Sequence, residues 1–167
     1  MAKLQIVAFG KLKTPGLRES ADYYLKVLSG FVPCEEIELK PLSVSEKSPE
    51  LRRKIQTQEA EVLLQRVTPQ SSHAAKPWLY LLDEKGKALP SSGWAELARS
   101  WEDQSAGRVV LCLGSSLGFA PELRAQARGL LSLGPHTLPH ELARVVLLEQ
   151  LFRSWSILRG HPYHNAD

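Results

Sequence analysis

Short apolar runs alternate along this chain with longer segments in which apolar residues recur every three or four positions. The strand-like runs cover residues 4–9, 78–82 and 109–113, and residues 36–39, where apolar and acidic residues alternate, indicate a further, half-exposed strand. Segments with helical periodicity separate them and follow them: 17–28, 50–67, 92–101, the stretch after Pro121 and the stretch after Pro139. Strands that alternate with helices are typical of layered α/β proteins. The sequence therefore predicts an α/β fold with a mostly parallel sheet flanked by helices.

Several element boundaries follow from local signals. Thr14 and Pro15 have the residue types of a helix cap and a first helical position, and the acidic and glycine residues of 83–86 indicate a turn. We expect a helix from Pro121 to about Leu131, then an extended piece over 133–138. The last helix is expected to begin at Pro139, with Leu142 among its inward residues, and to stop at Gly160.

Length and charge restrict the class of protein. The 167 residues fit one domain, and no repeat or low-complexity segment divides them, so we expect a single domain over 1–167. A net charge of +3 excludes a disordered polyelectrolyte and a strongly basic nucleic-acid arm. No run reaches the ~18 apolar residues of a membrane span, and the N-terminus lacks the apolar region of a signal peptide. We expect a cytoplasmic protein with no membrane partner.

The predicted topology nominates a ligand site. In open α/β sheets, ligands bind outside the carboxyl ends of the strands. Three segments follow predicted strands or lead into the last helix: Leu82-Asp83, Gly114–Gly118 and Leu133–Leu138. They are far apart in sequence, yet one geometric rule places all three at the same edge of the sheet.

The segment Gly114–Gly118 fits the G-x-S-x-G pattern that places a nucleophilic serine, here Ser116, between a strand and a helix. Acid and histidine candidates for a serine hydrolase follow in order: Glu141 or Glu149, then His161 or His164. The chain is short for that fold and has no HGGG-like loop upstream. A simple ligand loop is the favoured interpretation, and the hydrolase is the alternative. The segment lacks the Gly-Lys-Ser/Thr of a phosphate-binding loop and the third glycine of a dinucleotide fingerprint.

Two other features are candidate sites. Histidines recur at short spacing, His136 with His140 and His161 with His164, but Pro139 and Pro162 interrupt both pairs, so we expect no metal site. Arg144 lies one to two turns into a helix whose N-terminus faces the predicted site. Its planar guanidinium can hold a phosphate or a substrate oxygen. The alternative is an ion pair with Glu141 or Glu149 on the same helix.

Several motifs together resemble one family. They are Leu113 through Gly118, Thr137-Leu138-Pro139-His140, Glu149–Ser154 and His161-Pro162-Tyr163-His164, with Lys3–Lys11 and Leu82–Lys87 matching as well. In this order and at this separation they resemble the RlmH family, bacterial methyltransferases of the SPOUT superfamily that act on N3 of a pseudouridine in large-subunit (23S) ribosomal RNA. The resemblance covers nearly the whole chain.

The resemblance implies a C-terminal trefoil knot, a homodimer and S-adenosylmethionine as cofactor. The partner it implies is ribosomal RNA within the assembled ribosome or large subunit. Carried over, the cofactor contacts fall on Leu82, Gly114, Leu133, Gly134, Pro135, His136, Thr137 and Leu138. His140, Tyr163 and His164 would position the base or assist loss of its proton, and Arg144 would hold a phosphate or a uracil carbonyl oxygen. The tail would complete the pocket of the other subunit.

The chain departs from the family pattern at three positions. Ser115 replaces a glycine, Leu117 replaces a polar residue, and Asn165 stands where a basic residue is usual. Leu117 and Asn165 suggest a further alternative, a knotted RNA-binding protein without catalytic activity. We also expect Gly114→Val to weaken cofactor binding, because a branched side chain would fill the ligand's space or strain a backbone with positive φ.

Overall fold

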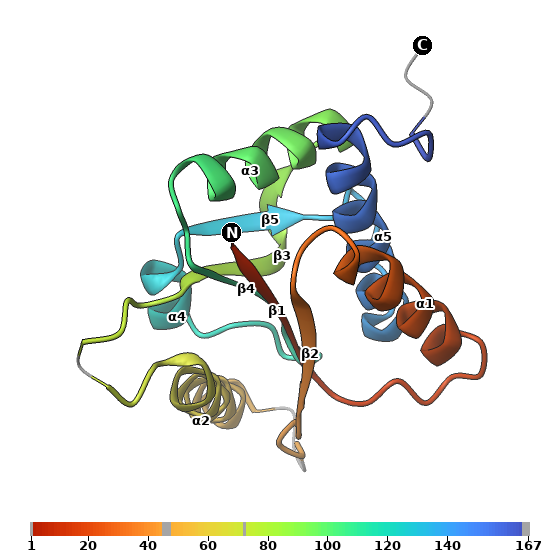
Figure 1. Cartoon of the computed structure of the whole chain (residues 1–167). Coiled ribbons are helices and arrows are strands. Elements are labelled where there is room, and N and C mark those ends of the chain that lie inside the picture. The colour runs from red at the N-terminus through yellow and green to blue at the C-terminus, as the bar shows by residue number, and fades with distance from the viewer. Residues whose placement is uncertain (1, 45–47, 72, 165–167) are drawn as a thin grey trace.

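A five-stranded, all-parallel sheet forms the centre of the molecule, with helices on both faces (Figure 1). The computed structural model describes residues 2–44, 48–71 and 73–164. In chain order the elements are β1 (Lys3–Phe9), α1 (Leu17–Ser29), β2 (Cys34–Leu39), α2 (Pro49–Val67), β3 (Trp78–Ala88), α3 (Ser91–Asp103), β4 (Arg108–Leu113), α4 (Pro121–Gln126), β5 (Gly129–Ser132) and α5 (His140–Leu158). The strand order is β2-β1-β4-β3-β5. The predicted fold class is confirmed.

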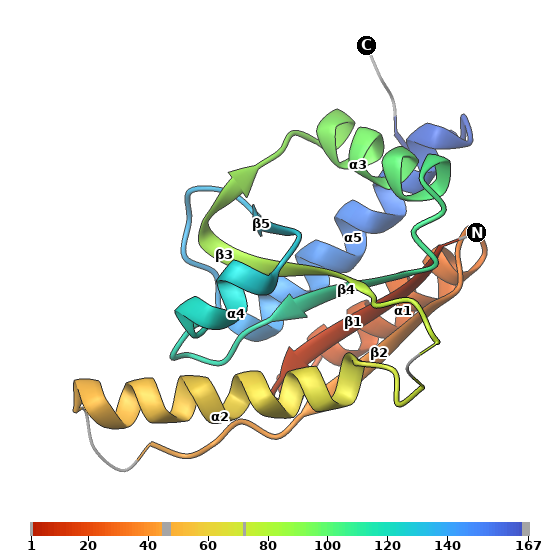
Figure 2. The same ribbon diagram turned by 90° about the vertical axis from the view of Figure 1, so that its left-hand side faces the viewer.

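Each face of the sheet has its own hydrophobic core, because successive side chains of a strand point to opposite faces. In β1, Leu4 and Ile6 belong to the core under α1, α3 and α5, whereas Val7 and Phe9 belong to the core under α2 and α4. Figure 2 shows α2 on one side of the sheet and α3 with α5 on the other. The two central strands are buried on both faces, which explains why they read as continuous apolar runs.

The first helix begins later than expected. Gly16, with φ +83°, is its N-terminal cap, and no side chain caps it. The predicted capping role of Thr14 is wrong, because its hydroxyl instead donates a hydrogen bond to the Glu141 carboxylate at 2.7 Å. The Thr14 hydroxyl, which the local sequence predicts to cap the helix, is thus bound to a residue 127 positions later in the chain.

The third strand is longer than expected, and the predicted turn over 83–86 is wrong. β3 runs on to Ala88 through an irregularity at which both Leu82 and Lys87 pair with Leu131 of β5. Gly86 lies in this bulge. A β-carbon there would come within 2.6 Å of the Leu131 backbone, so a glycine lets the two strands approach. The residues that suggested a turn instead form a bulge.

The helix expected from Pro121 to Leu131 ends at Gln126. Residues 129–132 form β5 against β3, so the second half of that prediction is wrong. Pairing with a strand some fifty positions earlier in the chain overrides the local helical pattern. Residues 133–138 form a loop after β5.

The last helix begins one residue after the expected position, with Pro139 as its cap, and packs against α1 and α3. Leu147, Leu148, Leu151 and Trp155 have no exposed surface. Leu142, predicted to face inward, is 36% exposed and points away from the core. No helix in the described part of the chain is long and apolar enough to cross a membrane. The trefoil knot stays a prediction.

Candidate functional site

A cavity of about 550 Å³ lies where the three nominated loops meet the start of α5. Its walls come from residues 82–84, 113–119, 132–134 and 136–139, together with His140 and Ala143 of α5. Arg52 and Gln56 of α2 and Arg124 of α4 complete the lining. Three segments that are distant in sequence therefore line one pocket. The prediction that the strand ends bring them together is confirmed.

Most of the residues predicted to bind a cofactor line this cavity. They are Leu82, Gly114, Leu133, Gly134, His136, Thr137 and Leu138. Pro135 belongs to the same loop but is not among the lining residues. The loop is tied at its start, where the Ser132 hydroxyl donates to Gly134 O at 2.9 Å and accepts from Gly134 N at 3.2 Å. Gly134 has φ +131°, a conformation that favours glycine.

The structure tests one of the two reasons predicted for a glycine at position 114. The φ of Gly114 is not in the left-handed region, so the argument from backbone strain is wrong. A β-carbon at this position would lie 3.0 Å from Cζ of Phe119, closer than an ordinary contact. The Phe119 ring, which itself lines the cavity, therefore also restricts this position to a glycine.

The Gly114–Gly118 loop is held by α2. The Ser115 hydroxyl donates to Glu59 at 2.7 Å, and Glu59 is only 3% exposed. Arg52 and Gln56 donate to the Leu117 carbonyl at 3.0 and 2.6 Å. Two positions that depart from the family pattern, 115 and 117, are therefore the points where the loop is fixed to the helix.

A nucleophile elbow is absent from this loop. Ser116 lines the cavity, but its φ is not positive, and α4 begins only at Pro121. The nucleophile of an elbow sits on a sharp, strained turn directly before a helix. The acids and histidines proposed as its partners have other contacts: Glu141 with Thr14, Glu149 with Arg153 and Tyr163, His161 with Phe31, and His164 with Arg153. The serine hydrolase alternative is not supported.

An ion pair between the buried Asp83 and the partly exposed Arg124 forms one wall of the cavity. Asp83 follows Leu82, and its side chain is 4% exposed. It lies 2.8 Å from the Arg124 guanidinium and also accepts from the backbone N of Lys85. Sequence reasoning missed Arg124, Phe119 and the two α2 residues Arg52 and Gln56. Only the nearness of Phe119 to the glycine loop was a usable signal, because nothing in the sequence places α2 over that loop.

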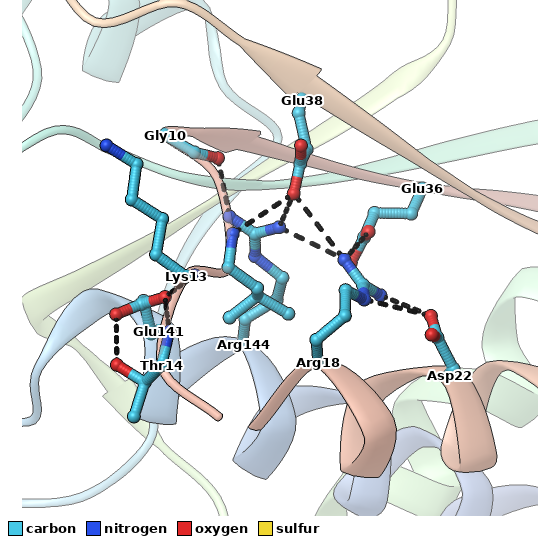
Figure 3. Close-up of polar contacts among 10 residues, drawn as sticks. Gly10, Lys13, Thr14, Arg18, Asp22, Glu36, Glu38, Glu141 and Arg144 are labelled. Atoms are coloured by element: carbon cyan, nitrogen blue, oxygen red, sulfur yellow. Dashed lines mark hydrogen bonds and ion pairs between the residues drawn. The ribbon is translucent and has the colours of Figure 1, made fainter. Parts of the chain in front are cut away.

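The four residues predicted to act on substrate separate into two groups. His140 lines the cavity, whereas Arg144, Tyr163 and His164 do not. Arg144 has no exposed surface. It lies 2.7 Å from Glu38 and 3.5 Å from Glu36, both on β2, and donates to Gly10 O at 2.7 Å (Figure 3).

The observed role of Arg144 is structural. Its partners are neither Glu141 nor Glu149, the two acids that the sequence offered, and its guanidinium is not free to hold a substrate oxygen in this conformation. Partial burial acts to raise the pKa of Glu38, but hydrogen bonds from Arg144 and Leu12 N, with the charges of Arg144 and Arg18, together outweigh it and lower that pKa. Glu38 is therefore ionised at neutral pH, and its contact with Arg144 joins α5 to β2.

The C-terminal tail lies along the second half of α5. The Tyr163 hydroxyl donates to Glu149 at 3.0 Å, and the Arg153 guanidinium sits 4.9 Å from the Tyr163 ring centre. His164 Nδ1 is 3.3 Å from Arg153. Burial, with hydrogen bonds to neighbouring Tyr24 and Glu149, raises the pKa of Tyr163, so its phenol is neutral at physiological pH. Asn165, noted as a departure from the family, lies outside the described residues.

Among the described residues, no group of three or more His, Cys, Asp or Glu side chains is arranged to hold a metal ion. The polar residues that line the cavity include Asp83 with its partner Arg124, Ser116, Thr137 and His140. Apolar surface comes from Leu82, Leu113, Leu133 and Leu138. This mixture of apolar walls and a few placed polar groups is typical of a site for a small organic ligand.

Comparison with known proteins gives one consistent result. A family model described as "Predicted SPOUT methyltransferase" matches residues 2–164. A protein of Maridesulfovibrio salexigens named ribosomal RNA large subunit methyltransferase H is 39% identical over 166 residues, covering 99% of this chain and 100% of that protein. A protein of Solidesulfovibrio magneticus with the same name is 36% identical over 165 residues, with 99% and 100% covered.

Proposed function

This chain belongs to the SPOUT methyltransferase family, and from that premise we propose that it methylates N3 of a pseudouridine in large-subunit ribosomal RNA, using S-adenosylmethionine. The curated relatives cited above carry the name of a large-subunit ribosomal RNA methyltransferase and match this chain end to end. The observation that supports the proposal is the cavity, because it is lined by the three loops that the strand-end rule and the sequence resemblance each predict to form the site.

The residues of the cavity fit such a cofactor. A volume of about 550 Å³ lies within the range of small-molecule sites. Leu82, Leu133 and Leu138 offer apolar surface to an adenine ring, and the backbone of residues 133–138 offers hydrogen bonds to its edge. A β-carbon at Gly134 would meet nothing within 4 Å, so the glycine leaves that side of the loop open.

For this reaction the protein has to position the two reactants and help remove one proton from the base. When bound, S-adenosylmethionine supplies a methyl group that is already electrophilic. The chain has to hold the uracil-like ring in line and help the imide N3–H lose its proton. His140 is the titratable group that lines the cavity at the start of α5, and we assign it the task of orienting the base or accepting that proton.

We propose that the active form is a homodimer in which the tail of one subunit reaches the cavity of the other. Within one chain, Tyr163 and His164 pack beside Glu149 and Arg153. Arg153 is ten residues beyond Ala143, about 15 Å along the helix from the cavity lining. A role for the tail in chemistry therefore requires a second chain or a rearrangement. We propose the bacterial cytoplasm as its location, where ribosomes are found.

The first test is a methyl-transfer assay with labelled S-adenosylmethionine and large ribosomal subunits that lack the modification. We expect transfer by the wild-type protein and loss of most of it in His140→Gln. His73→Gln, at an exposed position before β3, is the matched control and should retain activity. Cofactor binding measured by calorimetry without any transfer would instead support the catalytically inactive RNA-binding alternative.

Mixing variants tests the shared site. If the tail acts across the dimer, His140→Gln and Tyr163→Phe proteins, each weakly active alone, should restore activity when mixed, because one of the two sites in the mixed dimer is then intact. No restoration after subunit exchange would mean that both residues serve the same chain or that the tail has no role. Light scattering of the wild-type protein checks the dimer itself.

We further propose that the substrate is a structured ribosomal surface and not free RNA. The net charge of +3 per chain is modest for an RNA-binding enzyme. Affinity that depends on few phosphate contacts falls only slowly with salt, so shape has to supply specificity. Methylation of naked ribosomal RNA as fast as of whole subunits, with a steep salt dependence, would refute this part.

A further inference from the structure

The loop of residues 10–14, which joins β1 to α1, is fastened to the beginning of α5. Arg144 donates to Gly10 O at 2.7 Å. The Glu141 carboxylate accepts from the backbone N of Lys13, from Thr14 N at 3.0 Å and from the Thr14 hydroxyl at 2.7 Å. Figure 3 shows both α5 residues pointing into the loop. The loop is thus held at both ends by residues one and four positions after His140.

This loop lies beside the cavity. Gly10 has φ +108°, and a β-carbon added there would lie 3.5 Å from Nε2 of His140. Because His140 lines the cavity, the loop borders the site at which we place the substrate base. A side chain at Gly10 would be strained by its backbone and would also crowd the imidazole.

A network of ion pairs around the buried Arg144 holds this arrangement in place. Arg144 is fully buried between Glu36 and Glu38, and Glu36 lies 2.6 Å from Arg18. Arg18 in turn lies 2.7 Å from Asp22 on α1 (Figure 3). Removing one member of a buried ion pair leaves an uncompensated charge and is strongly unfavourable. The network therefore fixes α5, β2 and α1 relative to one another, and with them the loop.

The same loop presents two lysines to solvent. Lys11 and Lys13 are exposed, and neither forms an ion pair with any carboxylate of residues 2–44, 48–71 and 73–164. In Figure 3 the Lys13 side chain extends away from Glu141, which contacts only its backbone. The Glu141 charge is taken up by three hydrogen-bond donors, which lower its pKa to about 2. Positive charge therefore remains unpaired beside the cavity.

We propose that the 10–14 loop is an RNA-contacting element of this protein. Lys11 and Lys13 contact the phosphates that flank the nucleotide entering the cavity, and Glu141 and Arg144 are positioning residues that hold the loop beside His140. This inference rests on the proposed RNA substrate. It goes further by naming a segment outside the three strand-end loops as the element that meets the RNA backbone.

Binding of large ribosomal subunits that lack the modification, measured by co-sedimentation between about 50 and 200 mM salt, tests the lysines. Each phosphate contact contributes about 0.7–0.9 to the slope of log affinity against log salt. We expect the Lys11→Gln/Lys13→Gln variant to bind more weakly and to lose about 1.5 of that slope. Its affinity for S-adenosylmethionine should stay within about twofold of wild type. Lys26→Gln/Lys76→Gln removes the same charge at exposed positions away from the cavity and should keep the wild-type slope.

The positioning role is tested at Thr14, because an Arg144 variant risks not folding. Thr14→Val should weaken subunit binding severalfold, whereas Thr14→Ser keeps the hydroxyl and should restore it. A wild-type slope in the Lys11→Gln/Lys13→Gln variant, or an equal loss in the control pair, would overturn the proposal. Equal binding by the two Thr14 variants would overturn the positioning role. If the wild-type protein binds subunits but transfers no methyl group, the proposed activity is wrong. The binding measurements still decide whether the 10–14 loop contacts RNA.

Discussion

The hydrogen bond between Ser115 and Glu59 gives a prediction with a size that can be worked out. Ser115→Ala would remove the donor that lies 2.7 Å from Oε2 of Glu59, a carboxylate only 3% exposed. Water cannot replace that donor without opening the contact between α2 and the cavity loop. Leaving a buried acceptor without its partner costs about 1–3 kcal/mol, more when the acceptor is charged. For a chain of this length, 2 kcal/mol corresponds to a fall in Tm of roughly 4–8 °C.

The assay is thermal and urea unfolding of Ser115→Ala, Glu59→Gln and the double variant, with calorimetric titration of S-adenosylmethionine. The loss on Ser115→Ala should shrink by about 1 kcal/mol in the Glu59→Gln background, because a hydrogen bond to a neutral amide contributes less than one to a carboxylate. Cofactor affinity should also fall severalfold, since the loop loses its attachment to the helix.

Ser29→Ala is the matched control. Its hydroxyl donates to Leu25 O on the exposed end of α1, so its loss should change the free energy of unfolding by no more than about 0.5 kcal/mol. The reasoning is refuted if Ser115→Ala is as stable as this control, or if its cost is the same with and without the Glu59 carboxylate.

Three further predictions concern other parts of the molecule. Gly86→Ala should destabilise the protein by about 1–3 kcal/mol in urea unfolding and weaken cofactor binding, because its β-carbon would come within 2.6 Å of the Leu131 backbone in the strand that leads to the cavity loop. The Glu141 carboxyl has its pKa lowered from 4.5 to about 2, so it stabilises the fold above pH 4.5 and loses that contribution as the pH falls toward 2. The stability difference between wild type and Glu141→Gln should therefore shrink over that range, and a constant difference would contradict the assignment. Burial and nearby carboxylates raise the pKa of Cys34 to about 12, and burial also raises that of Cys112, so iodoacetamide at pH 8 should label neither thiol until the protein is unfolded.

The layout of the site was predictable because it depends on topology. Leu82, Gly114 and Leu138 are brought together by the ends of parallel strands, and apolar runs with helical periodicity between them are enough to infer such a sheet. The family resemblance named the same loops and added what they would bind. In the chain, His140 comes two residues after Leu138, the end of the last of these loops.

The partners of polar side chains were not predictable. Arg144 had two acids on its own helix at suitable spacing, yet it pairs with β2, 106 positions earlier in the chain. Thr14 has the residue type of a helix cap but bonds to α5. In both cases a long-range contact competes with a local one of similar chemistry, and only the packing of elements decides between them. Likewise, the glycine at position 86 suggested a turn, but it is there because β3 and β5 approach each other closely at this point. The local sequence contains no sign of that approach.

The strand order has a kinetic consequence. β1 pairs with β4, about a hundred residues later, and the contact between Lys13 and Glu141 spans 128 positions. Contacts so distant in sequence slow folding, because much chain must be ordered before they form. During synthesis the central strand pair cannot close until residue 113 has left the ribosome, and the loop beside His140 gains its attachment only when α5 docks. The cavity is therefore incomplete until α5 has docked, and a ligand that needs the whole cavity stabilises only the chain in which α5 is in place.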